Sequence, residues 1–279
     1  MKRFWLFVNW NKEHAAGTAS FVREWLLRHG AESVMITDEL DPHHIVEKAD
    51  CLITLGGDGT IIRASRRIAG SCVPIAGINL GHLGYLTAVS TKQEIPELLD
   101  ALLCDHYKIE ERMMLTGVLG EGKDCINQTE KPHLALNEIV LHRHTDASSV
   151  EFRVLVNGAF LNEYKADGII ISTPTGSTAY NLSAGGPIVD PSARMKILTP
   201  ICPHAMNRNS IVLKAEDRLD ILMPSGQKGE ISVSFDGAVN LSLGSGGCVR
   251  VTEAESTTPL IRLPGGTFLT ELRSKLTTL

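Results

Sequence analysis

The feature that most constrains this chain is a glycine-rich segment, Gly56-Gly-Asp-Gly-Thr60, placed directly after a short apolar run. Residues 51–55 predict a buried strand, and the two glycines that follow let the backbone turn sharply and approach a ligand. Residues 61–68 carry apolar side chains at helical spacing with cations on the other face, so we expect a helix with Thr60 as its N-cap and Asp58 on the loop. Because the amides at a helix N-terminus attract anions, these elements predict a phosphate-binding loop. An ordinary tight turn is the alternative, which three glycines around one carboxylate disfavour.

Length and composition limit the classes of protein to consider. With 279 residues, 43% of them hydrophobic, the chain can build one large domain or two ordinary ones. A net charge of -5 gives no reason to expect a nucleic-acid partner, and no apolar stretch reaches the length of a membrane span or a signal peptide. The six cysteines lack the spacing of a zinc site. We therefore expect thiols packed as small hydrophobes, no metal held by the protein, and a cytoplasmic location.

The first part of the chain alternates between strand and helix patterns, which predicts a Rossmann-like α/β nucleotide-binding domain over residues 1–110. The expected strands are 4–9, 33–36, 51–55 and 73–78, and the expected helices are 15–29, one opened by Asp41 and Pro42, 61–68 and 94–106. A second glycine-punctuated segment, residues 79–84, follows the last of these strands. Since both glycine-rich loops leave the carboxyl ends of strands, where open α/β sheets bind ligands, we expect them to line one crevice.

Over residues 111–265 the pattern changes to short β-branched or alternating runs between turn residues, which predicts a β-rich second domain. The expected strands are 134–141, 151–156, 167–172, 210–214, 218–223, 231–235 and 248–252. Residues 120–132 are polar and predict a surface loop. The tail, residues 266–279, has Phe268, Leu269, Leu272 and Leu276 on one helical face, so we expect this helix to dock back on the α/β domain.

Two polar clusters interrupt the β-rich half. Asn137 and Glu138 lie in a strand pattern otherwise made of apolar residues, and one of them would face the core, where an unpaired polar group is costly. A ligand, a buried network or a strand edge facing water would each explain the pair. Lys165 and Asp167 alternate on one face of an extended segment and could pair with each other or with a ligand. A hairpin turn at Asp167-Gly168 is the simpler explanation of that segment.

The third cluster, residues 172–187, reads Ser-Thr-Pro-Thr-Gly-Ser-Thr-Ala-Tyr-Asn-Leu-Ser-Ala-Gly-Gly-Pro. Its hydroxyls, small side chains and glycines offer many hydrogen-bond donors, which suits a nucleotide. A Ser/Thr-rich surface linker would explain the composition, but it would not explain Tyr180 and Asn181 in the middle of the segment.

In this order along the chain, these segments resemble the successive signatures of the NAD kinase family. The matching segments are 56–60, 77–84, Asn137-Glu138, 166–180 and 183–187. The first signature is shared with diacylglycerol kinases, sphingosine kinases and phosphofructokinases, whereas the Thr-Pro-Thr-Gly-Ser-Thr-Ala-Tyr run is highly specific. The resemblance implies a two-domain fold, an α/β domain beside a β-rich NAD-binding domain, and a homodimer or homotetramer.

The resemblance also implies a reaction. The family transfers the terminal phosphate of ATP, or of polyphosphate, to the 2′-hydroxyl of the adenosine ribose of NAD, with a divalent cation such as Mg²⁺ or Mn²⁺. Asp58 resembles the general base, and Gly59 its neighbour on the nucleotide loop. Arg63 occupies a basic nucleotide-side position, and Tyr85 stands where an adenine-facing phenylalanine is usual.

In the β-rich half, the resemblance implies that Asn137 and Glu138 hold the adenosine of NAD. Lys165 and Asp167 resemble residues that reach the nicotinamide half, a contact that a neighbouring subunit can supply. The residues that resemble the adenosine pocket are Thr178, Ala179, Tyr180, Asn181, Leu182 and Ser183. Ala238 stands where some relatives have glutamine, so no role is carried over to it.

Phosphoryl transfer depends mainly on positioning and charge neutralisation, because its transition state is loose. A carboxylate is too weak a base to hold the ribose as a free alkoxide, so we expect Asp58 to orient the 2′-hydroxyl and accept its proton late. Two other hypotheses stay open at the level of sequence. A lipid or sugar kinase that shares only the Gly-Gly-Asp-Gly loop leaves the Tyr180 region unexplained, and the intact Asp58 argues against a non-catalytic dinucleotide sensor.

Overall fold

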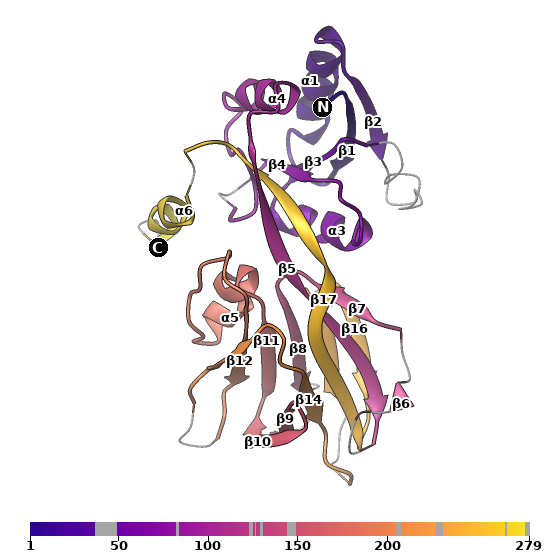
Figure 1. Cartoon of the computed structure of the whole chain (residues 1–279), viewed down its shortest axis with the longest axis vertical. Helices are drawn as coiled ribbons and strands as arrows, with labels where there is room; N and C mark the ends of the chain where they lie inside the picture. Colours follow the sequence, from indigo (N-terminus) through magenta and orange to yellow (C-terminus); the bar gives the residue numbers. More distant parts are fainter. Residues whose placement is uncertain are drawn as a thin grey trace. The chain divides into compact units, whose positions relative to one another are not determined.

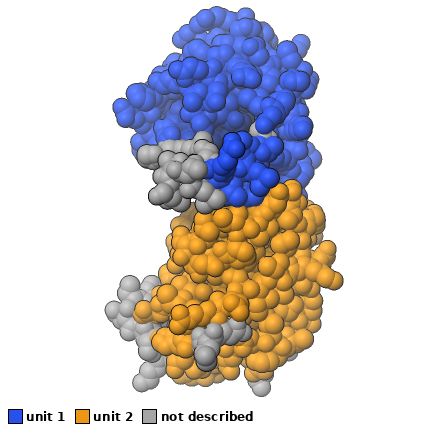
Figure 2. All heavy atoms as spheres, turned by 90° about the vertical axis from the view of Figure 1, so that its left-hand side faces the viewer, with its two compact units in different colours: residues 1–112, 256–279 blue, residues 113–255 orange. Residues whose placement is uncertain are grey.

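The structure, a computed structural model, describes residues 1–36, 49–81, 84–122, 125, 127–128, 131–143, 149–204, 208–226, 231–265 and 267–276. The chain forms two compact units, Met1–Arg112 with Ser256–Leu279, and Met113–Glu255 (Figure 2). Within the described ranges, none of the helices is both long enough and apolar enough to cross a membrane. The helix expected from Asp41 and Pro42 lies outside the described residues.

The first unit is an α/β domain (Figure 1). Four parallel strands form its sheet in the order β4 (Ile75–Asn79), β3 (Cys51–Gly56), β1 (Arg3–Val8) and β2 (Glu32–Ile36). The end of β17 (Gly247–Arg262) extends this sheet, because Leu260 pairs in parallel with Ile75 of β4. Among the described residues of the unit, the helices are α1 (Ala15–Arg28), α3 (Asp58–Arg67), α4 (Ile95–Leu103) and α6 (Phe268–Leu276).

Helices cover both faces of this sheet, as its near-continuous apolar strands require. Side chains from β1, β3 and β4 share one core with α1 and α4. The alternate strand residues point to the opposite face, where the guanidinium of Arg63 on α3 lies over the ring of Phe7 and Ile61 of α3 fills the space beside Gly77. Helix α3 is labelled in Figure 1. The carboxyl ends of the parallel strands lie at one edge of the sheet, so the loops that follow them lie together.

The second unit packs two mainly antiparallel sheets against each other. One has the order β10-β9-β14-β17, with β5 beside β17 and the short strands β6 and β7 beside β5, and the other has the order β13-β12-β11-β8-β15-β16. Their bounds are β5 (Lys108–Glu121), β6 (Asn127–Gln128), β7 (His133–Ala135), β8 (Glu138–Arg143), β9 (Val150–Val156), β10 (Ala159–Ala166), β11 (Gly168–Ser172), β12 (Met195–Ile201), β13 (Ile211–Lys214), β14 (Leu219–Leu222), β15 (Ile231–Phe235) and β16 (Val239–Leu243). Side chains from both sheets meet in one core. The predicted fold class, an α/β domain with a β-rich domain, is confirmed.

Two details of the glycine loop and of the first polar cluster differ from the prediction. Helix α3 begins at Asp58 with Gly57 as its N-cap, so Thr60 is not the cap but a buried residue of the first turn. It fits there because Gly56 has no side chain: a Cβ at that position would lie 2.1 Å from the Thr60 hydroxyl oxygen. The single strand expected over 134–141 is two strands, β7 and β8, interrupted at Leu136 and Asn137.

The hairpin expected at Asp167-Gly168 is wrong. The chain crosses there from β10 in one sheet to β11 in the other, and Gly168 lets the backbones approach closely, because a Cβ would lie 2.4 Å from the Leu141 carbonyl oxygen. The hairpin lies earlier, at Asn157-Gly158 between β9 and β10, where both residues have positive φ. Asn-Gly is the dipeptide that a tight two-residue hairpin favours, and the sequence interpretation overlooked it together with strand β10.

The cysteines and the tail also differ from the expectation. Cys125 and Cys248 form a disulfide, so the expectation of thiols that only pack as small hydrophobes is wrong for this pair. The tail is the helix α6, as expected, but Leu269 on its apolar face is 71% exposed. Glu271 of this helix forms an ion pair with Arg262 of β17.

Candidate functional site

Asp58 is fixed in place by the second glycine-rich segment. Its carboxylate accepts hydrogen bonds from the Tyr85 amide at 2.8 Å and from the Leu86 amide at 3.0 Å, one on each oxygen. A Cβ at residue 84 would lie 2.1 Å from the Asp58 Oδ1 atom, so only glycine leaves room for the carboxylate there. Asp58 is only partly buried, so the remaining lone pairs of an oriented carboxylate can meet a ligand.

Three strand ends meet around the N-terminus of α3. The Leu80 amide donates to the Gly56 carbonyl at 2.9 Å, and the Asn79 side-chain oxygen accepts from the Gly81 amide at 3.0 Å. Lys12, after β1, places its Nζ atom 3.6 Å from the point where a Cβ of residue 81 would lie. The structure therefore brings the two glycine-rich loops together beside the N-terminus of α3 and a cation, which is a favourable setting for phosphate.

The other predicted residues of this unit lie on α3 and on the second loop. Gly59 is exposed in the first turn of α3. Arg63 is half-buried, with its guanidinium 5.4 Å from the centre of the Phe7 ring. Burial, then the negative charges of Asp58 and Glu271, raises the pKa of the Tyr85 hydroxyl.

The fit of a divalent cation depends on the ligands that the chain offers. Among the described residues there is no group of three or more His, Cys, Asp or Glu side chains that could hold a metal ion. Asp58 is partly exposed and offers a carboxylate oxygen to a cation. Mg²⁺ is usually bound through one or two carboxylates together with substrate phosphates and water, so this residue fits such an ion.

In the second unit, Asp236 shapes the segment that contains Asn137 and Glu138. Its carboxylate accepts hydrogen bonds from the amides of Leu136, Asn137 and Glu138, at 2.9, 2.8 and 3.2 Å. At the break between β7 and β8, these bonds take the place of backbone hydrogen bonds to a neighbouring strand. The Asn137 side chain is half-buried, so its amide can reach a ligand.

Glu138 carries the most unusual environment of the predicted residues. Its side chain is 7% exposed, and its Oε2 atom is buried without a hydrogen-bond partner among the described residues. Burial, and secondarily the charge of Asp236, raises the pKa of this carboxyl to about 8. At neutral pH Glu138 is therefore mainly protonated, and it can donate a hydrogen bond as well as accept one.

The hydroxyl-rich segment packs directly on Asn137. It forms the short helices η1 (Thr175–Thr178) and α5 (Tyr180–Ser183). The Thr173 amide donates to the Asn137 carbonyl at 2.8 Å, and the Thr173 hydroxyl donates to the Leu136 carbonyl at 2.6 Å. A Cβ at Gly176 would lie 2.2 Å from the same Asn137 carbonyl oxygen, so glycine is required at that contact.

Within this segment the predicted pocket residues have different surroundings. Asn181 is fully buried, and its amide donates to the carbonyls of Ser177 and Pro187 while its oxygen accepts from the Thr199 hydroxyl at 2.7 Å. Asn181 therefore holds the segment in shape. Thr178, Ala179 and Leu182 are partly buried, and Tyr180 and Ser183 are exposed.

Lys165 and Asp167 do not pair with each other in the manner considered from the sequence. The Asp167 carboxylate accepts from Arg143 Nε at 2.8 Å, and Lys165 is exposed on β10. The structure thus brings Asn137, Glu138 and the 173–183 segment together, whereas Asp167 belongs to an ion pair with Arg143.

Comparison with known proteins shows the family to which the chain belongs. Residues 36–107 match the ATP-NAD kinase N-terminal domain, and residues 136–263 match the ATP-NAD kinase C-terminal domain. An NAD kinase of Lachnospira eligens is 35% identical over 99% of this chain and 100% of its own, and one of Symbiobacterium thermophilum is 45% identical over 82% and 79%. The chain belongs to the NAD kinase family.

Two solved structures of NAD and NADH kinases have the same fold. The structure of yeast NADH kinase complexed with NADH gives a TM-score of 0.86 at 24% identity, over 99% of this chain and 88% of that one. An Archaeoglobus fulgidus NAD kinase in complex with ATP gives 0.78 at 24% identity, over the full length of both chains. NAD kinases are phosphotransferases, so this chain belongs to an enzyme family.

Two residues that hold the predicted NAD kinase residues in place were missed in the sequence. Asp236 lies in the turn after β15, where both Asp236 and Gly237 have positive φ. An Asp-Gly pair predicts such a turn, but it does not indicate which amides the carboxylate will bind. Arg262 lies at the end of β17 with 7% of its surface exposed and donates to the Tyr85 carbonyl at 2.6 Å. Nothing in its own sequence neighbourhood indicates that contact, because the two residues are 177 positions apart.

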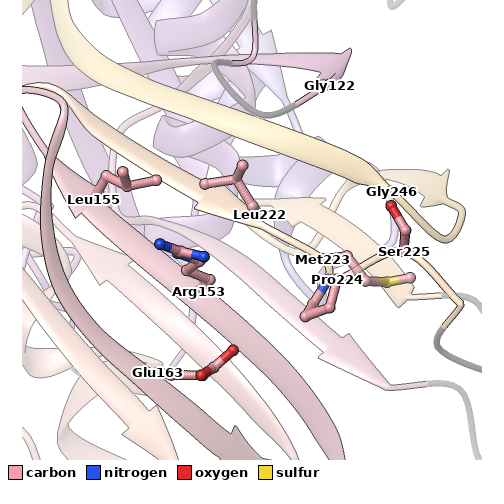
Figure 3. Close-up of a pocket in the computed structure, with 9 residues that line it drawn as sticks. All are labelled: Gly122, Arg153, Leu155, Glu163, Leu222, Met223, Pro224, Ser225 and Gly246. Atoms are coloured by element: carbon pink, nitrogen blue, oxygen red, sulfur yellow. The ribbon is translucent and has the colours of Figure 1, made fainter.

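The second unit also contains a cavity of about 560 Å³, which lies over β9, β10 and β14 (Figure 3). Its lining is Gly122, Arg153, Leu155, Glu163, Leu222, Met223, Pro224, Ser225 and Gly246. None of the residues that the NAD kinase signatures indicate lines it, so the site is better assigned by the chemistry of its side chains than by the volume of a hollow.

Proposed function

We propose that this chain is an NAD kinase that transfers the terminal phosphate of ATP to the 2′-hydroxyl of the adenosine ribose of NAD, giving NADP, with Asp58 as the general base. The observation that carries the proposal is the carboxylate of Asp58, held by the Tyr85 and Leu86 amides at the N-terminus of α3. The proposal is also supported by relatives that match nearly the whole chain and are named NAD kinase.

In this mechanism Asp58 orients the ribose hydroxyl and takes its proton as the new P–O bond forms. The two backbone amides fix the direction of the carboxylate, so little conformational entropy is lost in orienting it when the substrate binds. The amides of the first turn of α3 and the loop glycines face the transferring phosphate. A divalent cation, Mg²⁺ or Mn²⁺, would accompany the ATP phosphates and neutralise part of their charge.

The second unit supplies recognition of the acceptor. A protonated Glu138 can donate a hydrogen bond to an acceptor atom of the adenosine, and Asn137 can both donate and accept. The buried Oε2 atom of Glu138 has no hydrogen-bond partner in the described part of the chain, and an atom of a bound dinucleotide would satisfy it. We assign the packed segment 178–183, with Tyr180 at its exposed surface, to the adenosine as well.

The finer parts of the proposal follow the family. Polyphosphate is a second donor to test beside ATP, and the exposed Lys165 would reach the nicotinamide half of NAD. Asp167 would act beside it through its bond to Arg143. We also propose a homodimer or homotetramer in the cytoplasm. The domains would divide near residues 110 and 265, with the tail helix attached to the α/β domain.

The test is an assay of the purified protein with NAD, ATP and Mg²⁺, in which NADP is detected by an NADP-specific dehydrogenase. Parallel reactions replace ATP with polyphosphate, NAD with NADH, and NAD with diacylglycerol, sphingosine or fructose 6-phosphate. The proposal expects NADP in the first reaction and no product from the lipid or sugar acceptors. Phosphorylation of a lipid or sugar in place of NAD would contradict it, as would tight NAD binding without turnover.

A further inference from the structure

Arg262 contacts the same short segment that holds Asp58. Its guanidinium donates to the Tyr85 carbonyl at 2.6 Å and to the Thr87 carbonyl at 2.8 Å. The amides of Tyr85 and Leu86 in that segment donate to Asp58. One side of the segment is therefore bound to the proposed base, and the other side to a buried cation.

The link between the two residues passes through a single peptide unit. The Tyr85 carbonyl and the Leu86 amide belong to the same planar group, which cannot bend between them. Its oxygen accepts from Arg262, and its N–H donates to Asp58 at 3.0 Å. A donor on the oxygen also polarises the N–H and strengthens the bond to the carboxylate.

Two carboxylates compensate the buried charge of Arg262. Glu110 Oε2 lies 3.2 Å from its Nε atom, and Glu271 Oε1 lies 3.3 Å from its Nη1 atom. Glu110 also pairs with Arg112 at 2.5 Å. Burial alone would raise the pKa of Glu110, but the charges of Arg112 and Arg262 more than offset it, so its pKa is lowered and it stays ionised.

These bonds occupy all three nitrogens of the guanidinium, which leaves it poorly placed to bind a substrate phosphate. We propose that Arg262 is a positioning residue, which orients Asp58 by fixing the peptide between Tyr85 and Leu86. The expected effect of Arg262 on turnover rests on the proposed function, because the turnover measured is NADP formation. Glu271 then connects the C-terminal helix α6 to the base through Arg262.

Arg262→Lys is the direct test. Lysine keeps the charge but lacks the planar fork that reaches two carbonyls and a carboxylate at once. The control is Arg250→Lys in the second unit, because Arg250 also pairs through Nε with a buried carboxylate, Asp220, at 2.6 Å. Glu271→Gln is the milder variant, since it removes one charge partner from a helix face that is partly exposed.

Two quantities are measured for each variant: the kinetic constants for NADP formation, and the hydrogen exchange rate of the Leu86 amide by NMR. For Arg262→Lys we expect kcat to fall about tenfold to a hundredfold, as a displaced catalytic group does, while KM for NAD and for ATP changes less than about threefold. The Leu86 amide should exchange at least about tenfold faster. Glu271→Gln should change both quantities in the same direction by a smaller factor, and Arg250→Lys should change neither.

The inference is overturned if Leu86 exchange is unchanged in both Arg262→Lys and Glu271→Gln, or if kcat stays at the wild-type value while exchange accelerates. If Arg262→Lys does not fold, Glu271→Gln decides by the same two measurements. If the wild-type protein makes no NADP, the proposed function is wrong. The exchange rate of the Leu86 amide would then still show whether Arg262 fixes the segment from Tyr85 to Thr87.

Discussion

The raised pKa of Glu138 leads to a measurable dependence of stability on pH. Glu138 is 7% exposed, and the pKa of its carboxyl is raised from 4.5 to about 8, chiefly by burial and further by the charge of Asp236. The folded protein therefore holds this proton more tightly than the unfolded chain does. The resulting stabilisation is complete below about pH 4.5 and is lost as the pH rises through about 8.

The size of the effect follows from the shift. At about 1.4 kcal/mol per unit, a shift of this extent corresponds to an upper limit of roughly 4 to 5 kcal/mol between the two ends of the window. Glu138→Gln keeps the shape and the neutral state of the protonated acid, so it removes the titration without introducing a charge. We expect the variant to have nearly wild-type stability at pH 5 and to be more stable than the wild type at pH 9.

The assay is urea unfolding at pH steps between 5 and 9, reported as the free energy of unfolding of the variant minus that of the wild type. Glu163→Gln is the control, because Glu163 is an exposed carboxylate on β10 of the same unit. The control should give a difference that does not change across this window. A Glu138→Gln difference that is equally flat would mean that Glu138 ionises normally, and our assignment of a protonated donor would be wrong.

Three other outcomes are expected. Gly84→Ala should lower kcat by about 10²-fold or more with folding retained, because the new methyl carbon would lie 2.1 Å from Asp58 Oδ1 and must displace it. Steady-state kinetics and a thermal melting curve would measure the two effects. Unchanged turnover would contradict the geometry. Asn137→Ala should raise KM for NAD about tenfold to a hundredfold while KM for ATP changes much less, and equal effects on both would make the residue structural. Sedimentation at micromolar concentration should give at least a dimer, and a fully active monomer would exclude the proposed assembly.

The sequence predicted the elements whose signal is local. The apolar run before Gly56 predicted strand β3, and the alternation of strand and helix patterns over residues 1–110 predicted the parallel sheet and its helices. The strand over 134–141 was misread because its break is caused by Asp236, about 100 residues away, which takes three of its amides. A pattern within a segment carries no information about a partner so distant.

The candidate site shows the same limit. Asp58 could be singled out because glycines surround it, but its orientation depends on the Tyr85 and Leu86 amides, which any residue type could supply. Asn181 was assigned to the adenosine pocket by the family resemblance. The sequence did not indicate that its side chain also bonds to Ser177, Pro187 and Thr199. The sequence indicated the region, whereas the contacts of its residues depend on partners that no local pattern reveals.

The most direct test of the central claim is the turnover of Asp58→Asn. Asparagine keeps the size of the side chain and can still accept one of the two amide bonds, but it cannot take the ribose proton. Asp100→Asn, an exposed carboxylate on α4, is the control. NAD affinity and the melting temperature should stay near those of the wild type, while kcat for NADP formation falls by roughly 10²-fold or more, the usual loss on removal of a general base. Turnover of Asp58→Asn near the wild-type rate would contradict the assignment of Asp58 as the base.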